Sequence, residues 1–214
     1  MYKAIIFDLD GTLLDTLDDL TAAVNYALQK KNLPLRTREE VRSFVGNGIL
    51  KLMERSAGAD NIALAPDLLQ QFKGYYASHC ADETKPYDGV MKLLESLKNK
   101  GVYTAVVSNK ADFAVKKLAD FYFKDLLNLA VGENEEKGIK RKPDPASLIA
   151  VIDELGVEKT ETVYIGDSEV DIQTAKNAGV DCISVSWGFK NREFLEKNGA
   201  LCLVNSVEEL QKFL

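Results

Sequence analysis

The segment that most constrains the fold is residues 2–14, YKAIIFDLDGTLL. Its apolar run at residues 4–7 stops at Asp8, and Asp10 follows two positions later. A continuous apolar run of this kind is typical of a strand that is buried on both faces, as in a parallel sheet. The carboxyl ends of such strands carry the ligand crevice, so we expect both aspartates there. Because residues i and i+2 of a strand point the same way, two such carboxylates need a cation, a shared proton or both.

Residues 16–81 have apolar side chains at helical spacing, which predicts an all-helical block. Thr37 and Glu40 form the capping box of its second helix, which we expect to continue to about residue 53. Gly46 and Gly48 interrupt that helix. Each glycine costs a helix interior about 1 kcal/mol relative to alanine, so we expect a break there or a close approach of the backbone to another group.

From residue 82 onwards, strands and helices alternate, which predicts a parallel sheet. The fold class is therefore α/β, with a doubly wound, Rossmann-like core formed by residues 1–15 and 82–214. The helical block is a cap domain inserted after the first strand, and the two chain crossings can act as a hinge. After the first strand we expect strands at residues 102–107, 126–131, 162–165, 182–187 and 201–204, and helices at residues 90–100, 111–121, 171–178 and 206–213, with a further helix opening at Asp144 as N-cap and Pro145 as first residue.

Composition excludes several classes of function. The net charge of −6 and the lack of a basic run argue against nucleic-acid binding. No stretch approaches the roughly 20 apolar residues of a membrane helix, and the N-terminus does not resemble a signal peptide, so we expect a cytoplasmic protein. Three widely spaced cysteines argue against a disulfide framework or a zinc site. His79 is the only histidine, and nothing in its surroundings supports a catalytic role.

Polar side chains follow three of the expected strands, at the edge where a parallel sheet binds ligands. Carboxylates with few other ligands suit Mg²⁺, whereas lysine, serine and backbone N–H groups suit phosphate. Each residue alone has a structural alternative as a turn residue, a helix cap or a surface charge. Together they favour a magnesium-assisted phosphoryl-transfer site. The candidates are Asp8 and Asp10 after the first strand, Ser108 and Asn109 after the second, Asp167 and Asp171 after a third, and Lys142 at the start of a helix.

The chain resembles the haloacid-dehalogenase-like phosphohydrolase superfamily over nearly its full length. Four motifs carry the resemblance in order: D-x-D-G-T at residues 8–12, a strand-ending Ser108, Lys142 before Pro-x-Pro, and G-D-S-x-x-D at residues 166–171. Within the superfamily the chain is similar to the phosphoglycolate phosphatase branch. The helical insert, the sequence Val-Gly-Asn-Gly at residues 45–48 and Ser-Asn-Lys at residues 108–110 support that branch.

The resemblance implies a role for each motif. Asp8 would be the nucleophile that forms an aspartyl-phosphate, and Asp10 the general acid and base, oriented by Thr12. Mg²⁺ would be bound by Asp8, the backbone carbonyl of Asp10, Asp167 and, directly or through water, Asp171. The transferring phosphoryl group would be held by Ser108, Asn109, Lys142 and the N–H of Gly11. The cap would close over the site and select the leaving group through Gly46, Asn47 and Gly48, with Arg42 or Lys51 nearby.

We therefore expect a phosphomonoesterase that acts on a small phosphorylated metabolite, such as 2-phosphoglycolate, as a monomer or homodimer. A pyrophosphatase, a nucleotidase or a phosphomutase would use the same residues and stays an alternative. A receiver-like signalling domain is disfavoured by the helical insert, although a silent phosphate-binding protein of this fold is compatible with the motifs. A calcium loop is excluded because Leu13 stands where an EF-hand needs glycine. Dehalogenases of the superfamily lack the second aspartate, which Asp10 supplies here.

Overall fold

The computed structural model describes residues 2–134 and 138–214, and the chain divides into two compact units. The core unit consists of Met1–Leu14 and Pro86–Leu214, and the helical unit consists of Asp15–Lys85. The chain passes between them at β2 (Leu14–Asp15) and β3 (Lys85–Pro86), which pair as a two-stranded sheet. The second crossing thus lies slightly later than the predicted position 82.

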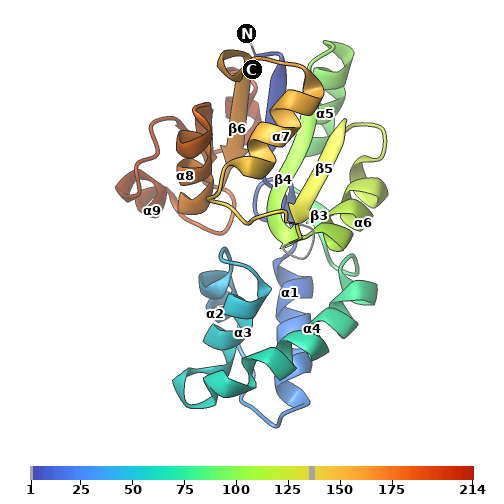
Figure 1. Cartoon of the computed structure of the whole chain (residues 1–214), viewed down its shortest axis with the longest axis vertical. Helices are drawn as coiled ribbons and strands as arrows, with labels where there is room; N and C mark the ends of the chain where they lie inside the picture. The colour runs from blue at the N-terminus through green and yellow to red at the C-terminus, as the bar shows by residue number, and fades with distance from the viewer. Residues whose placement is uncertain (1, 135–137) are drawn as a thin grey trace. The chain divides into compact units, whose positions relative to one another are not determined.

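The core unit is built on a six-stranded sheet in the order β5-β4-β1-β6-β7-β8, with every neighbouring pair parallel (Figure 1). This confirms the predicted fold class, because in sequence order it is the 3-2-1-4-5-6 arrangement of doubly wound proteins. The strand order reverses at β1, so the carboxyl end of β1 is the expected ligand position. The strands are β1 (Ala4–Phe7), β4 (Tyr103–Ala111), β5 (Leu129–Glu133), β6 (Thr162–Gly166), β7 (Asp181–Val185) and β8 (Leu203–Val204).

Helices cover the sheet and follow its strands in sequence. The register places Ile6, Ala105 and Tyr164 side by side on one face, where they pack with residues of α7 and α8. Figure 1 shows α7 crossing that face. Helices α5 and α6 pack against β4. All four residues of β1 are buried, as its apolar run predicts. The helices are α5 (Val90–Asn99), α6 (Asp112–Phe123), α7 (Ala146–Leu155), α8 (Glu169–Ala178), α9 (Arg192–Lys197) and α10 (Val207–Leu210), with a 3₁₀ turn, η3, at Lys159–Glu161.

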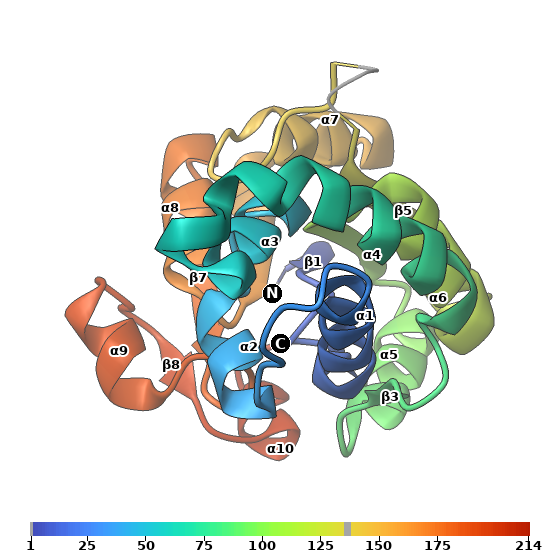
Figure 2. The same ribbon diagram turned by 90° about the horizontal axis from the view of Figure 1, so that it is seen from below.

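The helical unit contains α1 (Leu17–Gln29), α2 (Arg38–Phe44), α3 (Ile49–Ala57), the 3₁₀ helix η1 (Ala59–Leu64) and α4 (Ala65–His79). Helices α1 and α4 pack together (Figure 2). Between them, Tyr26 stacks on Tyr75 with ring centroids 4.4 Å apart. The predicted capping box of Thr37 and Glu40 is confirmed.

The break predicted at Gly46 and Gly48 is confirmed, because α2 ends at Phe44 and α3 begins at Ile49. Gly46 and Gly48 have φ angles of 127° and 83°. Side chains with a Cβ rarely adopt such angles, so the two glycines produce the predicted break.

Several boundaries in the core unit also differ from the prediction. Strand β4 does not end at Val107 but continues to Ala111, with a register shift against β5 between these two residues. Helix α7 begins at Ala146, so Asp144 is not its N-cap, although Asp144 Oδ1 accepts a hydrogen bond from the Ala146 N–H (2.9 Å).

Helix α8 begins at Glu169 rather than at residue 171, because Ser168 caps it. Strand β5 starts at Leu129 instead of residue 126, and β7 ends at Val185 instead of residue 187. Strand β8 starts two residues late, and α10 is confined to Val207–Leu210. Helix α9 was not predicted. Among the described residues, no helix is both long enough and apolar enough to cross a membrane.

A buried carboxylate ties α1 to the segment that leaves the helical unit. Asp19 Oδ1 accepts a hydrogen bond from the Glu83 N–H (3.0 Å). Its Oδ2 accepts from the N–H (2.9 Å) and the hydroxyl (2.7 Å) of Thr84. The two ends of this unit are therefore held together by one side chain.

We expect Asp19→Ala to lower the free energy of unfolding by at least about 2 kcal/mol, because hydrogen bonds to a charged group contribute roughly 1.5–3 kcal/mol and the two donors of Thr84 would be left buried. The matched control is Asp18→Ala on the same helical turn, where the carboxylate is exposed and pairs with Arg38 at 2.7 Å. Exposed ion pairs contribute about 0–1 kcal/mol, so Asp18→Ala should lower the free energy of unfolding by less than about 1 kcal/mol. Urea unfolding measures both, and equal losses would contradict the assignment to Asp19.

Candidate active site

Three buried carboxylates meet at the carboxyl ends of the central strands. Asp8 directly follows β1, Asp167 directly follows β6, and Asp171 lies in the first turn of α8. They are 7%, 2% and 0% exposed, and one oxygen of each lies within 4.8 Å of the others. The structure thus brings together three of the four predicted metal-binding aspartates at the point where the strand order reverses.

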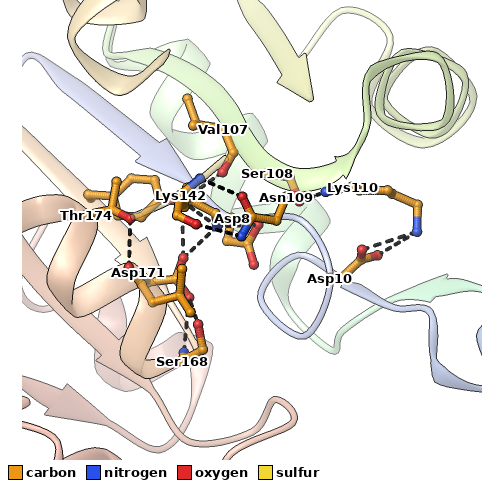
Figure 3. A network of polar contacts seen from close by, with 12 residues as sticks. Asp8, Asp10, Val107, Ser108, Asn109, Lys110, Lys142, Ser168, Asp171 and Thr174 are labelled. Atoms are coloured by element: carbon orange, nitrogen blue, oxygen red, sulfur yellow. Dashed lines mark hydrogen bonds and ion pairs between the residues drawn. The ribbon is translucent and has the colours of Figure 1, made fainter. Parts of the chain in front are cut away.

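Lys142 places its ammonium inside this cluster (Figure 3). Its Nζ lies 2.6 Å from Asp171 Oδ1 and 2.9 Å from Asp8 Oδ1, and its side chain is 4% exposed. Nζ also donates to the hydroxyl of Tyr164 (2.9 Å), which in turn donates to the Val107 carbonyl (2.7 Å). Tyr164 was predicted only as a strand residue, because nothing in its sequence context distinguishes it from other core aromatics.

Asn109 holds the backbone of Lys142. Its Nδ2 donates to the Lys142 carbonyl (3.1 Å), and its Oδ1 accepts from the Lys142 N–H (2.7 Å). Both ends of the amide are therefore engaged, so the observed role of this side chain is to position the lysine. The predicted contact between Asn109 and phosphate stays a prediction. Ser108 is 5% exposed, and its Oγ accepts a hydrogen bond from the Lys110 N–H (3.3 Å).

Asp171 is fixed in place by the capping box that opens α8. Its Oδ2 accepts from the N–H (3.0 Å) and the hydroxyl (2.5 Å) of Ser168, while its Oδ1 faces Lys142. Gly166 makes this arrangement possible, because a Cβ at position 166 would overlap the Asp171 carboxylate. Since both of its oxygens already have donors, Asp171 mainly holds the lysine, and Asp8 and Asp167 keep more lone pairs for a cation.

The loop after β7 supports Asp167. Sequence reasoning predicted Asp167 but missed this loop. The N–H of Phe189 donates to Asp167 Oδ2 (2.6 Å), and a Cβ at Gly188 would overlap both that oxygen and the Gly11 carbonyl. The indole N–H of Trp187 donates to the Thr12 carbonyl (3.1 Å). The available signal was the glycine between two aromatics, which is compatible with a close approach of backbone to a neighbouring group.

Gly11 is required for the turn after β1 rather than for its N–H. Its φ angle is 84°, and a Cβ there would overlap the carboxylate of Asp167. Its N–H donates to the Leu14 carbonyl (2.9 Å). The expectation that this N–H binds phosphate therefore has no support in the turn as observed.

Asp10 is paired with a lysine that the sequence analysis did not single out as a site residue. Lys110 Nζ lies 3.0 Å from Asp10 Oδ1 and 3.2 Å from Oδ2. Figure 3 shows this pair to one side of the Asp8–Lys142–Asp171 cluster. The predicted orientation of Asp10 by Thr12 is not seen, because Thr12 Oγ1 is buried without a hydrogen-bond partner among the described residues.

Burial and mutual repulsion shift the ionisation of the cluster. Burial raises the pKa of Asp8 to about 6, against the opposing effect of Lys142. Burial, followed by the charges of Asp171 and Asp8, raises the pKa of Asp167 well above its usual range. Burial alone would lower the pKa of Lys142, but the charges of Asp171 and Asp8 outweigh it and raise that pKa. Lys142 therefore stays charged while the carboxylates compete for it.

The chemistry of these donors fits a divalent cation. Asp8 Oδ1 is buried and in ion-pair contact with Lys142, but it has no hydrogen bond of good geometry among the described residues. Two further carboxylates lie within reach, and oxygen donors of this kind are preferred by Mg²⁺. A cation bound here would relieve the excess of negative charge that raises the pKa values of Asp8 and Asp167.

The predicted selectivity residues Gly46, Asn47 and Gly48 form the loop between α2 and α3 in the helical unit. Arg55, which sequence reasoning missed, holds this loop through the Phe44 carbonyl (2.6 Å) and Asn47 Oδ1 (2.7 Å). The other two candidates, Arg42 and Lys51, form ion pairs with Glu39 (3.6 Å) and Glu54 (2.5 Å). Substrate selection by this loop stays a prediction.

Comparison with known proteins identifies relatives over the whole chain. Residues 5–185 match the family model "Haloacid dehalogenase-like hydrolase". The phosphoglycolate phosphatase of Pseudomonas syringae pv. syringae is 34% identical, over 99% of this chain and 78% of its own length. The phosphoglycolate phosphatase of Rhodospirillum rubrum is 34% identical, over 100% of this chain and 91% of its own length. A crystal structure from Lactobacillus delbrueckii subsp. bulgaricus, provisionally named as a phosphoglycolate phosphatase, is 39% identical, with a TM-score of 0.92 and coverage of 99% and 98%.

We expect Asp167→Asn to stabilise the metal-free protein, and increasingly so as the pH rises. Because the folded state raises the pKa of Asp167, wild type loses stability as the pH rises from the unfolded pKa of about 3.9 through the folded pKa. Asparagine carries no charge and can still accept from the Phe189 N–H. The melting temperature of the variant with a chelator should exceed that of wild type by at least about 3 °C at pH 8, which is roughly 1 kcal/mol, and by less at pH 5. A lower melting temperature at pH 8 would refute this.

We expect Gly188→Ala to lower the free energy of unfolding by about 1–3 kcal/mol, because the added methyl overlaps Gly11 and Asp167 in a packed site. The control is Gly74→Ala in α4, where nothing lies within 4 Å of the new Cβ. That change should raise stability by up to about 1 kcal/mol, since alanine favours the helix. Urea unfolding of both variants is the measurement, and an unchanged Gly188→Ala protein would show that the loop yields without cost.

Proposed function

The chain belongs to the haloacid dehalogenase-like hydrolases and is a phosphoric monoester hydrolase, and we propose that it hydrolyses small phosphorylated metabolites with Mg²⁺, foremost 2-phosphoglycolate. The observation that carries this proposal is the position of Asp8. It stands at the carboxyl end of the central strand, with Oδ1 2.9 Å from the ammonium of Lys142. The name phosphoglycolate phosphatase, carried by both relatives above, supports the substrate.

Asp8 is the nucleophile in this proposal. Its carboxylate attacks phosphorus, the bond from phosphorus to the leaving oxygen breaks, and the phosphoryl group passes to Asp8 as an aspartyl-phosphate. Lys142 lies beside Asp8 and donates to the phosphoryl oxygens as charge develops on them. The hydroxyl of Ser108, at the same end of the sheet, adds a second donor. Positioning and charge stabilisation of this kind are most of what phosphoryl transfer requires.

Asp10 moves the protons. It donates a proton to the leaving oxygen in the first step. In the second step it takes a proton from the water that attacks the aspartyl-phosphate, which releases phosphate and restores Asp8. Its two contacts with Lys110 hold its carboxyl group in position before substrate binds.

Asp8, Asp167 and the backbone carbonyl of Asp10 would hold Mg²⁺, with Asp171 completing the acidic group. The bound ion neutralises the repulsion between an anionic nucleophile and an anionic phosphate. Asp167 is prepared for this role by the Phe189 N–H, which restrains one of its oxygens at 2.6 Å. The cytoplasmic location and the monomeric or homodimeric state stay predictions.

We expect Asp8→Asn to lower kcat with a phosphate monoester by at least ~10³-fold, since removing a nucleophile abolishes the covalent route. Chelation of divalent cations should lower the wild-type rate to a similar extent, and added Mg²⁺ should restore it. The control is Asp153→Asn, at an exposed position of α7, which should keep the wild-type rate. Equal rates for wild type, Asp8→Asn and chelated protein would rule out the mechanism.

A panel of phosphorylated metabolites tests the substrate. We expect 2-phosphoglycolate to give the highest kcat/KM. A strong preference for pyrophosphate, a nucleotide or a sugar phosphate would replace this substrate while leaving the Asp8 chemistry intact. Conversion of a sugar phosphate into its isomer, without release of phosphate, would indicate a phosphomutase.

A further inference from the structure

Transfer of the phosphoryl group alone does not explain why the buried Lys110 pairs with the partly buried Asp10. The lysine side chain is 3% exposed, and both oxygens of Asp10 lie within 3.2 Å of its Nζ. The pair joins the irregular end of β4 to the turn after β1. It uses a second ammonium, distinct from Lys142, on the side of the site where Asp10 stands (Figure 3).

A lysine in this position is costly unless it faces an anion, because an isolated buried ammonium is strongly disfavoured. In the structure the anion is Asp10. During the reaction, however, Asp10 must direct an oxygen to the leaving oxygen of the substrate. The ammonium has three N–H donors in changeable directions, so it can donate to a further anionic group close to Asp10.

Ordinary bond lengths define which substrate group that would be. A carboxylate on the carbon that bears the leaving oxygen has its own oxygens roughly 3 Å from the leaving oxygen. A hydrogen bond from Asp10 to the leaving oxygen spans about 2.7 Å, and Lys110 Nζ is 3.0 Å from Asp10. These three distances link four atoms in a chain: a carboxylate oxygen, the leaving oxygen, an Asp10 oxygen and Lys110 Nζ. Each link is about 3 Å, so the chain can close with Nζ at hydrogen-bond distance from the carboxylate. Lys110 can therefore reach a carboxylate on the carbon that bears the leaving oxygen.

Lys142 cannot serve this purpose. Its Nζ is shared between Asp8 and Asp171, on the side of the site where phosphorus would be attacked. The two lysines therefore divide the substrate between them: Lys142 faces the phosphoryl group and Lys110 faces the leaving group.

We propose that Lys110 is the specificity-determining residue of the core unit and binds a carboxylate on the carbon next to the leaving oxygen. The substrate class is the phosphate esters of 2-hydroxycarboxylates, of which 2-phosphoglycolate is the smallest member. The inference rests on the proposed function, since it places the phosphoryl group at Asp8 and the leaving oxygen at Asp10.

The test compares two esters that differ in one group. 2-Phosphoglycolate carries the carboxylate, and 2-hydroxyethyl phosphate has a neutral hydroxymethyl group in its place. We expect Lys110→Met, which keeps the length of the side chain and removes its charge, to lower kcat/KM by at least ~100-fold for 2-phosphoglycolate and by less than ~10-fold for 2-hydroxyethyl phosphate. Lys110→Arg keeps the charge and should retain the preference for the carboxylate.

The control is Lys3→Met, which removes an exposed lysine that pairs with Glu161; it should leave both kcat/KM values unchanged. An equal fall for the two esters in Lys110→Met would overturn the proposal and make Lys110 a residue that only orients Asp10. A wild-type enzyme that shows no preference for 2-phosphoglycolate would overturn it as well. If Lys110→Met does not fold, Lys110→Gln and the wild-type preference provide the same comparison.

The failure of this inference is distinguishable from failure of the proposed function. If wild type with Mg²⁺ hydrolyses 2-hydroxyethyl phosphate and p-nitrophenyl phosphate as readily as 2-phosphoglycolate, the phosphatase chemistry stands and the assignment of Lys110 falls. If wild type hydrolyses none of the three esters, the proposed function fails and the inference falls with it.

Discussion

Lys142 places a positive charge among three buried carboxylates, and this contact determines which other groups the site needs. Taking a single ion out of water costs several kcal/mol even after relaxation, so the ammonium and its anions are stable only together. Both the ammonium of Lys142 and its carboxylates must therefore be held in position. Asn109 accordingly holds the lysine backbone, Tyr164 contacts its ammonium, and Ser168 holds Asp171 against it. The cluster still has more carboxylates than ammonium groups, which leaves a place for a divalent cation.

The sheet makes this precision possible. Asp8, Lys142 and Asp171 are far apart in sequence, and they meet because β1 lies between β4 and β6 in a sheet that is covered on both faces. A site on the ends of packed strands is held more rigidly than one built on loops alone. Two parts of the site lie neither at a strand end nor in a helix. One is Lys142, in the turn before α7, and the other is the loop after β7, where Gly188 lets the backbone touch Asp167 directly. At Gly188 the lack of a side chain permits this close backbone contact, which holds Asp167 in place as rigid elements hold other residues of the site.

Much of this site could be predicted from residues that interrupt apolar runs. Asp8, Ser108 and Asp167 each end an apolar run in the sequence, and that pattern alone places them at one edge of the sheet. Lys110 was missed because β4 continues past Val107. The lysine lies inside this strand, within its register shift, and its Nζ contacts Asp10. Tyr164 and Gly188 escaped because their contacts depend on partners distant in the chain. A local sequence pattern does not reveal a hydrogen bond to a residue far away in the chain. It also does not reveal where a side chain would overlap such a residue, so that only glycine fits.

The structure also changes how the two aspartates of the first strand end are understood. Their spacing implied two anions in need of one cation or a shared proton. Instead each has its own ammonium from a different segment: Lys142 for Asp8 and Lys110 for Asp10. The two ion pairs use different lysines, but they are electrostatically linked, because the charge of Asp10 helps to raise the pKa of Asp8. In the proposed function, Lys142 serves the attack on phosphorus and Lys110 serves recognition of the leaving group. One strand end then carries two roles that depend on ammonium groups from different segments.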